Sequence, residues 1–353
     1  MTDNKNEELL FQYACGYRFN EFDSLFCEME EEMSPDALGE AYLMRAQIKL
    51  CTTDLTAPDD LAKAMKGSRI PKFPPLINSW KSDGINHFIA FSKASGLLKE
   101  FVAAFPEVRK KLSYWYGNQS DIVLTQMQGE ICYFMGDIEM ALPFAETHRS
   151  MPVNRIDAIL GLILEYRCYL ALMQPEKAQQ CMFDIIRHSK AYPECVEIYG
   201  AFRLWANLTT GWSGDSPRFY EDEDGREQPV LKDRLEGIRL GLARHTPIES
   251  HFIEYAEKSC EDIYTIRQYY MDWFHAMYWL SVDDRKQAET YFHKIYKIAA
   301  ASGVFMPVIE CGAQSLPILE YMKKLDTELP LDDVMRRSKH YEECVNVYRL
   351  ADN

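Results

Sequence analysis

The sequence lacks any cluster of residues with the spacing of a known metal site. Its ten cysteines are scattered without a Cys-x-x-Cys pair, and its eight histidines form no His-Glu-x-x-His motif. The acidic stretch 221–225 is no calcium loop, because the closing position of such a loop falls on Leu231. We therefore expect no metal and no cofactor. The spread of the cysteines indicates reduced, buried thiols in a cytosolic protein.

The sequence also has fewer basic than acidic residues. Lysine and arginine number 39 against 54 acidic residues, for a net charge of −15. A surface this acidic repels phosphate backbones, so we expect no direct nucleic-acid binding. The polar N-terminal segment lacks the apolar run of a secretory signal. The most apolar stretch, 156–173, contains Asp157, Glu165 and Arg167, which argues against a membrane span. These features predict a cytoplasmic protein without a membrane partner.

Catalytic motifs are missing as well. No serine lies in a Gly-x-Ser-x-Gly elbow, and no Gly-x-x-x-x-Gly-Lys-[Ser/Thr] phosphate loop occurs. No cysteine has an obvious activating neighbour. Folding can still bring two carboxylates together, so an enzyme remains an alternative, but the sequence favours a protein without catalytic activity.

A helical pattern dominates what is present, and its clearest unit covers residues 124–148. Gly136-Asp137 divides this unit into two helices, with the small residues Gly129 and Ala141 on the faces that meet. Small residues let antiparallel helices approach to about 8–10 Å. Gly129, Gly136-Asp137, Ile138-Glu139 and Ala141 resemble the helix–turn–helix unit of tetratricopeptide repeat (TPR) proteins. The resemblance implies stacked helical hairpins with a repeat of about 34 residues.

The small residue of the second helix recurs along the chain. Ala141, Ala178 and Ala288 lie 37 and 110 residues apart, and the second separation is close to three times the first. One hairpin cannot bury its apolar face alone, so a common period predicts hairpins that stack. The predicted fold is all-α: a right-handed superhelix (α-solenoid) of about 16 helices in stacked antiparallel hairpins, similar to TPR proteins.

We expect one such α-solenoid over residues 1–353. Residues 1–117 form less regular N-terminal helices, residues 118–325 contain the clearest repeats, and residues 326–353 form a C-terminal capping helix. One irregular insertion interrupts the pattern near 212–233, where Asp224-Gly225 between short β-formers is a hairpin-turn signal.

Start and stop signals locate several helices. Ser34 followed by proline is typical of a helix N-terminus, because serine caps the free amide groups and proline needs no partner there. Two separate helices are predicted over 94–104 and 106–116. A later helix over 306–323 is expected to kink at Pro317.

A second resemblance involves the stretch from Ala288 to Met322. A helix ends there in a small-residue and glycine turn at 299–303, and a proline, an acid and a glycine follow at Pro307, Glu310 and Gly312. This arrangement resembles the end of the superhelical sensor region in LuxR-type regulators of the maltose-activator class. In that family the sensor lies between an ATP-binding module and a DNA-binding domain, and in some members it binds a small inducer.

This chain has no phosphate loop, and the residues after Met322 are too few for a DNA-binding domain. The resemblance therefore implies the fold and a sensing role at most. If the chain is a sensor module, its ATPase and DNA-binding domains are absent from this sequence.

The candidate binding site is the inner face of the predicted stack. In stacked hairpins the first helix of each unit lines the concave surface, so residues of equal phase align there. Glu130, Arg167 and Arg203 recur at spacings of 37 and 36 residues. The other candidates lie one turn away or at the matching phase of a later unit: Gln126, Tyr133, Leu170, Asn207, Tyr270, Trp273 and Met277.

Two interpretations of these residues remain open. An arginine flanked by Leu164, Tyr166 and Leu170 needs a partner when it is partly buried, so Glu130 can simply pair with Arg167 inside the stack. Alternatively, the arginines and aromatic residues line a groove that takes an anionic or peptide-like ligand.

The favoured function is that of a non-enzymatic regulatory or interaction protein. It would bind a peptide, a protein segment or a small-molecule ligand in its concave groove, with a homodimer as one possible assembly. A LuxR-like sensor module is the first alternative. An enzyme with its site in the groove or under the insertion is the second. Binding needs only area and anchors, whereas chemistry needs a constellation that the sequence does not display.

Overall fold

The computed structural model describes residues 2–16, 18–67, 70–76, 98–150, 155–196, 198–200, 202, 206, 266–281 and 283–351. These residues are predominantly helical and contain no strand, which confirms the all-α class. The predicted insertion at 212–233, with its Asp224-Gly225 turn, lies outside the described residues.

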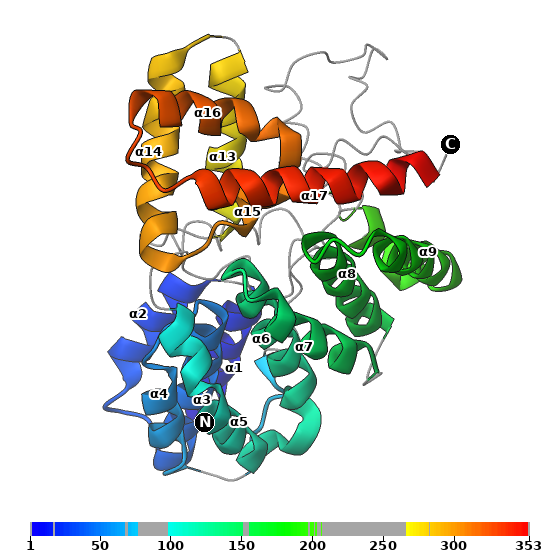
Figure 1. Cartoon of the computed structure of the whole chain (residues 1–353). Helices are drawn as coiled ribbons and strands as arrows, with labels where there is room; N and C mark the ends of the chain where they lie inside the picture. The colour runs from blue at the N-terminus through cyan, green and yellow to red at the C-terminus, as the bar shows by residue number, and fades with distance from the viewer. Residues whose placement is uncertain are drawn as a thin grey trace, which may run out of the picture.

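Two helical hairpins begin the chain. The first joins α1 (Thr2–Cys15) to α2 (Phe19–Met29), and the second joins α3 (Pro35–Cys51) to α4 (Ala57–Ala64). Helix α3 begins as predicted: the Ser34 side chain accepts a hydrogen bond from the Ala37 amide, and Pro35 occupies the first position. Helix α1 packs on α3, which places the two hairpins side by side (Figure 1).

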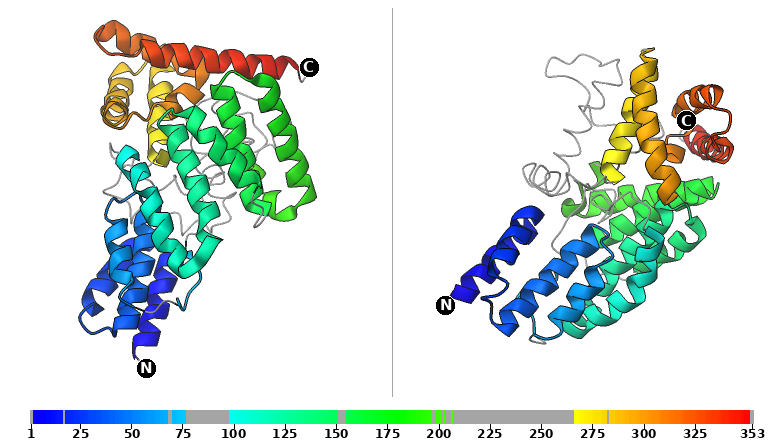
Figure 2. Two further views of the ribbon diagram at one scale, coloured as in Figure 1. Left: turned by 60° about the horizontal axis from the view of Figure 1, so that its bottom comes forward. Right: turned by 90° about the vertical axis from the view of Figure 1, so that its left-hand side faces the viewer.

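A run of antiparallel helices follows, each packed on the next (Figures 1 and 2). It comprises α5 (Leu98–Tyr116), α6 (Asp121–Phe134), α7 (Ile138–Ser150), α8 (Arg155–Ala171) and α9 (Pro175–Ala191). The prediction of two helices over 94–104 and 106–116 was wrong, because α5 continues through Pro106. Phe101, Phe105 and Leu112 belong to one continuous buried stripe, and burying that stripe offsets the cost of an internal proline.

The C-terminal part contains α13 (Ile266–Ser281), α14 (Arg285–Ser302), α15 (Met306–Glu310), α16 (Leu316–Leu325) and α17 (Asp332–Ala351). The expected kinked helix over 306–323 is instead two helices separated by a short 3₁₀ turn. Pro317 lies in the first turn of α16, where a missing amide hydrogen costs little. Helix α17 runs from α15 and α16 across to α8 and α9 (Figures 1 and 2).

Four hairpin turns share one backbone geometry. A residue with positive φ follows the first helix, and the next amide donates to a carbonyl five residues earlier, as in a Schellman motif. The positive-φ residues are Thr53, Gly136, Met173 and Asp283. The hydrogen bonds run from the backbone amide of Asp54 to the carbonyl of Lys49 (2.8 Å), and likewise from Asp137 to Cys132, Gln174 to Tyr169 and Asp284 to Trp279 (2.9 Å each).

Small residues lie where the helices meet. Ala141, Ala178 and Ala288 are all fully buried. A Cβ on Gly129 would lie 2.9 Å from Leu164 Cδ2 and 3.0 Å from Phe144 Cβ, so α6 approaches α7 and α8 too closely there for a larger residue.

The cysteines that the structure describes are free thiols, and all of them except Cys15 and Cys27 are buried. None of the described helices is both long enough and apolar enough to cross a bilayer.

Candidate functional site

Arg167 lies at the centre of a buried polar network, here called the Arg167 network, with Tyr133, Tyr270 and Glu310. Arg167 Nε donates to Glu310 Oε1 at 2.9 Å, and Nη2 donates to the Tyr270 hydroxyl at 3.1 Å. Both tyrosine hydroxyls donate to the Glu310 carboxylate. The guanidinium carbon lies 4.5 Å from the Tyr133 ring centroid, so it also makes a cation–π contact.

The surroundings keep the Arg167 guanidinium and the hydroxyls of Tyr133 and Tyr270 protonated. Burial alone would lower the pKa of Arg167, but the Glu310 carboxylate raises it well above its ordinary value. Burial raises the pKa of Tyr133 and Tyr270, and Glu310 raises both further. The guanidinium therefore stays charged and the hydroxyls stay donors. A network satisfied in this way is rigid.

The network connects four helices that are distant in sequence. Tyr133 comes from α6, Arg167 from α8, Tyr270 from α13 and Glu310 from α15, and the hydrogen bonds span 40 to 177 residues. Arg167 thus pairs inside the protein, as one interpretation proposed. The acid that pairs with it in the described part of the chain is Glu310, however, and not Glu130. In the sequence, Glu310 stands out only within the stretch that resembles LuxR-type regulators.

Gln126 and Glu130 belong to a second buried network, on the same face of α6 as Tyr133 and nearer the start of the helix. Gln126 Nε2 donates to Glu130 Oε1 at 2.7 Å, and Gln126 Oε1 lies 2.5 Å from His148 Nδ1. The amide nitrogen of Gln126 is the donor, so its oxygen must accept and His148 Nδ1 carries the proton. His148 Nε2 then turns its lone pair toward Asp157 Oδ1, 3.9 Å away.

Burial disfavours charge on both ends of this pair. It lowers the pKa of His148 to about 4 and raises the pKa of Asp157 to about 6. At neutral pH the histidine is therefore uncharged beside an aspartate whose ionisation burial opposes. The two groups affect stability with opposite dependence on pH.

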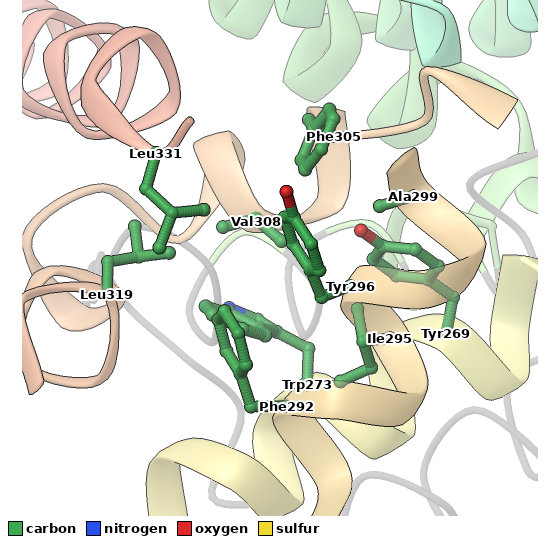
Figure 3. Close-up of a pocket in the computed structure, with 10 residues that line it drawn as sticks. All are labelled: Tyr269, Trp273, Phe292, Ile295, Tyr296, Ala299, Phe305, Val308, Leu319 and Leu331. Atoms are coloured by element: carbon green, nitrogen blue, oxygen red, sulfur yellow. The ribbon is translucent and has the colours of Figure 1, made fainter. Parts of the chain in front are cut away.

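The remaining predicted residues lie in the apolar core. Leu170 is fully buried, Trp273 is 1% exposed and Met277 is 8% exposed. Trp273 borders an apolar cavity with Phe292, Leu319 and Leu331 (Figure 3), and the volume of about 10 Å³ leaves room for no more than one water. Arg203 and Asn207 are outside the described residues.

The described members of the predicted inner-face site are therefore interior residues. Arg167, Glu130, Gln126 and Tyr133 have no exposed surface, so they do not present their polar ends to an open groove. A shared helical phase identifies a common face but does not reveal whether other helices cover it. Here α13 and α15 cover it.

An open cleft of about 340 Å³ lies elsewhere, between the α8–α9 turn, α15 and α17. We call it the α17 cleft. Its lining consists of Ala171, Leu172, Met173, Ile309, Arg336, Arg337, His340 and Tyr341. Three separate segments thus contribute an apolar wall and a basic wall.

Helix α17 supplies the basic wall through its periodicity. Arg336 and His340 are four residues apart, as are Arg337 and Tyr341, so the two pairs form adjacent rows on one face. Arg336 pairs with Asp333 one turn earlier. The basic run 336–340 is a sequence signal for this wall, although the helix was predicted only as a C-terminal cap.

Arg337 is half-buried against the α6–α7 turn. Its Nη2 lies 3.3 Å from Met306 Sδ, and a Cβ on Gly136 would come within 3.0 Å of the same nitrogen. Within the described ranges no carboxylate lies within the 4.0 Å limit of an ion pair to Arg337. A guanidinium has five N–H donors, and the described residues provide an acceptor for only one of those on Arg337, the sulfur of Met306.

Tyr341 connects the α17 cleft with the Arg167 network. Its ring lines the cleft, while the side chain is 2% exposed. Burial raises the pKa of Tyr341 well above its ordinary value, and the nearby Glu310 carboxylate raises it further. Its hydroxyl has no hydrogen-bond partner among the described residues.

Among the residues that the structure describes, no three histidine, cysteine or acidic side chains converge as a metal site would require. Comparison of the chain with protein-family models and with curated proteins finds no match. The resemblances to TPR proteins and to the maltose-activator class therefore stay predictions.

Proposed function

We propose that this chain is a non-enzymatic binding protein built on a TPR-like α-solenoid, and that it takes its ligand in the α17 cleft. The repeated turn geometry supports the solenoid. Gly136, Met173 and Asp283 lie 37 and 110 residues apart, the same spacings as the buried alanines. Turns of one geometry at multiples of one period are what stacked hairpins require, and the turn at Thr53, 83 residues before Gly136, lies outside that period.

The cleft itself carries the proposal of binding. Its volume of about 340 Å³ lies at the lower end of the range for small-molecule sites, which is roughly 300–1,000 Å³. It combines an apolar wall with a few polar groups, and the Arg167 network behind it fixes α8 and α15, which supply part of its lining. A site on a rigid support loses little entropy when a ligand binds.

A regulatory role is part of this proposal. Helix α17 contacts α8, α9, α15 and α16, so a ligand beneath it touches elements from both parts of the chain. The sensor-module alternative requires the same small-ligand occupant and adds separate output domains. A small ligand is therefore the first occupant to test.

The test is a fragment screen against a variant with a filled cleft. Ala171→Trp places a large ring in the cleft, and Ala301→Trp makes the same change at an exposed position of α14 as a matched control. Ligand-observed NMR with anionic, cationic and neutral fragments should detect binders to the wild type and to Ala301→Trp that Ala171→Trp loses. Circular dichroism checks that both variants fold. Binding that survives Ala171→Trp, or no binding at all, would overturn the proposal.

A further inference from the structure

We infer that the ligand of the α17 cleft is a small organic carboxylate with an apolar body, and that Arg337 binds its carboxylate. This inference rests on the proposed function and specifies the chemical class of ligand.

The charges around the cleft favour an anion. Arg336 and Arg337 line it, and the nearby acid Asp333 is engaged by Arg336. Arg337 is half-buried and has no carboxylate partner among the described residues, although burying an unpaired cation is unfavourable. A carboxylate would supply the missing charge. Its two oxygens match the planar fork of the guanidinium.

The arginines of the cleft contrast with the acidic charge of the chain as a whole. The chain carries a net charge of −15, so most of its surface repels anions. The run 336–340 contains Arg336, Arg337 and Lys339, and the first two of these line the cleft. A local positive site on an acidic protein admits a small anion, whereas the surrounding negative charge disfavours a long polyanion.

The opposite wall favours an apolar body on the ligand. Ala171, Leu172, Met173 and Ile309 offer only hydrocarbon and thioether surface, and the Tyr341 ring continues that surface. The volume of about 340 Å³ corresponds to on the order of ten water molecules, and hence to an acid of about ten non-hydrogen atoms. Inorganic phosphate would leave this wall uncovered.

The probes are benzoate, hexanoate, benzyl alcohol, benzylamine and inorganic phosphate, with binding measured by NMR titration of the full chain. We expect the two carboxylates to bind most tightly and to weaken as salt is added. Arg337→Gln should weaken benzoate binding at least about tenfold, since a hydrogen bond to a charged group contributes about 1.5–3 kcal/mol. Arg337→Lys should restore part of the loss because it keeps the charge without the fork.

Arg187→Gln is the matched control, because Arg187 is an exposed arginine on α9, 80% exposed and outside the cleft lining. It should leave benzoate binding unchanged. If Arg337→Gln lowers stability but not affinity, Arg337 only supports the α6–α7 turn and the inference is wrong. Should Arg337→Gln fail to fold, loss of benzoate binding in Ala171→Trp together with the order of probe affinities decides the question.

The panel separates this inference from the proposed function. If benzyl alcohol or benzylamine binds as tightly as benzoate and Ala171→Trp abolishes that binding, the cleft is a site but not for carboxylates. Tighter binding of inorganic phosphate than of either carboxylate would contradict the inference that the ligand has an apolar body. If none of the probes or fragments binds in the cleft, both proposals fail.

Discussion

Substitution of Glu310 by glutamine should cost this protein a large part of its stability. The carboxylate of Glu310 accepts hydrogen bonds from Arg167, Tyr133 and Tyr270, which lie on α8, α6 and α13. Glutamine keeps the shape and one acceptor oxygen but removes the charge. The guanidinium of Arg167, which has no exposed surface, would then lack the negative charge of Glu310.

The expected loss follows from this burial. Removing one partner of a buried ion pair typically costs 3–5 kcal/mol, because the other charge is left uncompensated. Whole domains are stable by only about 5–15 kcal/mol, so Glu310→Gln should remove about a fifth of the total or more. An exposed pair contributes at most about 1 kcal/mol, and the pair of Arg187 with Asp184 provides that comparison through Arg187→Gln.

Urea unfolding followed by circular dichroism and tryptophan fluorescence measures these losses. Trp273 and Trp279 on α13 report on the side of the molecule that Glu310 holds in place. The double variant Glu310→Gln with Arg167→Met removes both charges. It should be more stable than the sum of the two single losses predicts, by about 2 kcal/mol or more. A Glu310→Gln loss below about 1 kcal/mol, or strictly additive losses, would refute the assigned role of the network.

Two further predictions concern a turn and a buried pair. Gly136→Ala and Gly303→Ala should each lower the free energy of unfolding by about 1–2 kcal/mol, because both glycines have positive φ. Only the new Cβ at position 136 contacts Arg337, so only Gly136→Ala should weaken benzoate binding in the NMR titration. Equal benzoate affinity in the two variants would contradict that contact. The pKa of His148 is 6.5 in the unfolded chain but about 4 in the folded protein. Protonation of His148 therefore lowers the free energy of unfolding as the pH falls from 6.5 to 4. His148→Gln should remove about 2 kcal/mol of the stability loss between pH 7 and pH 5. Asp157, with a folded pKa raised to about 6, has the opposite effect, because its contribution to stability is lost as the pH rises through 6. Asp157→Asn should therefore make the stability loss between pH 7 and pH 5 larger by about 1–2 kcal/mol. Urea titrations at the two pH values test both signs, and a change of the same sign in the two variants would rule out the pair as described.

Local features of this protein were predictable from its residues. The Ser34 cap, the Gly136-Asp137 turn and the contact surfaces of Gly129 and Ala141 all depend on neighbours within a few positions. Helical periodicity and turn chemistry act at that range, so the sequence alone determines the all-α class and the places where several hairpins reverse.

Only the tertiary structure decided which side chains pair with one another and which helix faces are buried by other helices. The aligned phase of Glu130 and Arg167 predicted a shared face, but a residue 143 positions from Arg167, Glu310, supplies the charge that pairs with it. The α17 cleft likewise exists only because α17 crosses to the α8–α9 turn. Which helix covers which face depends on the packing of the whole apolar surface, and no local pattern records that choice.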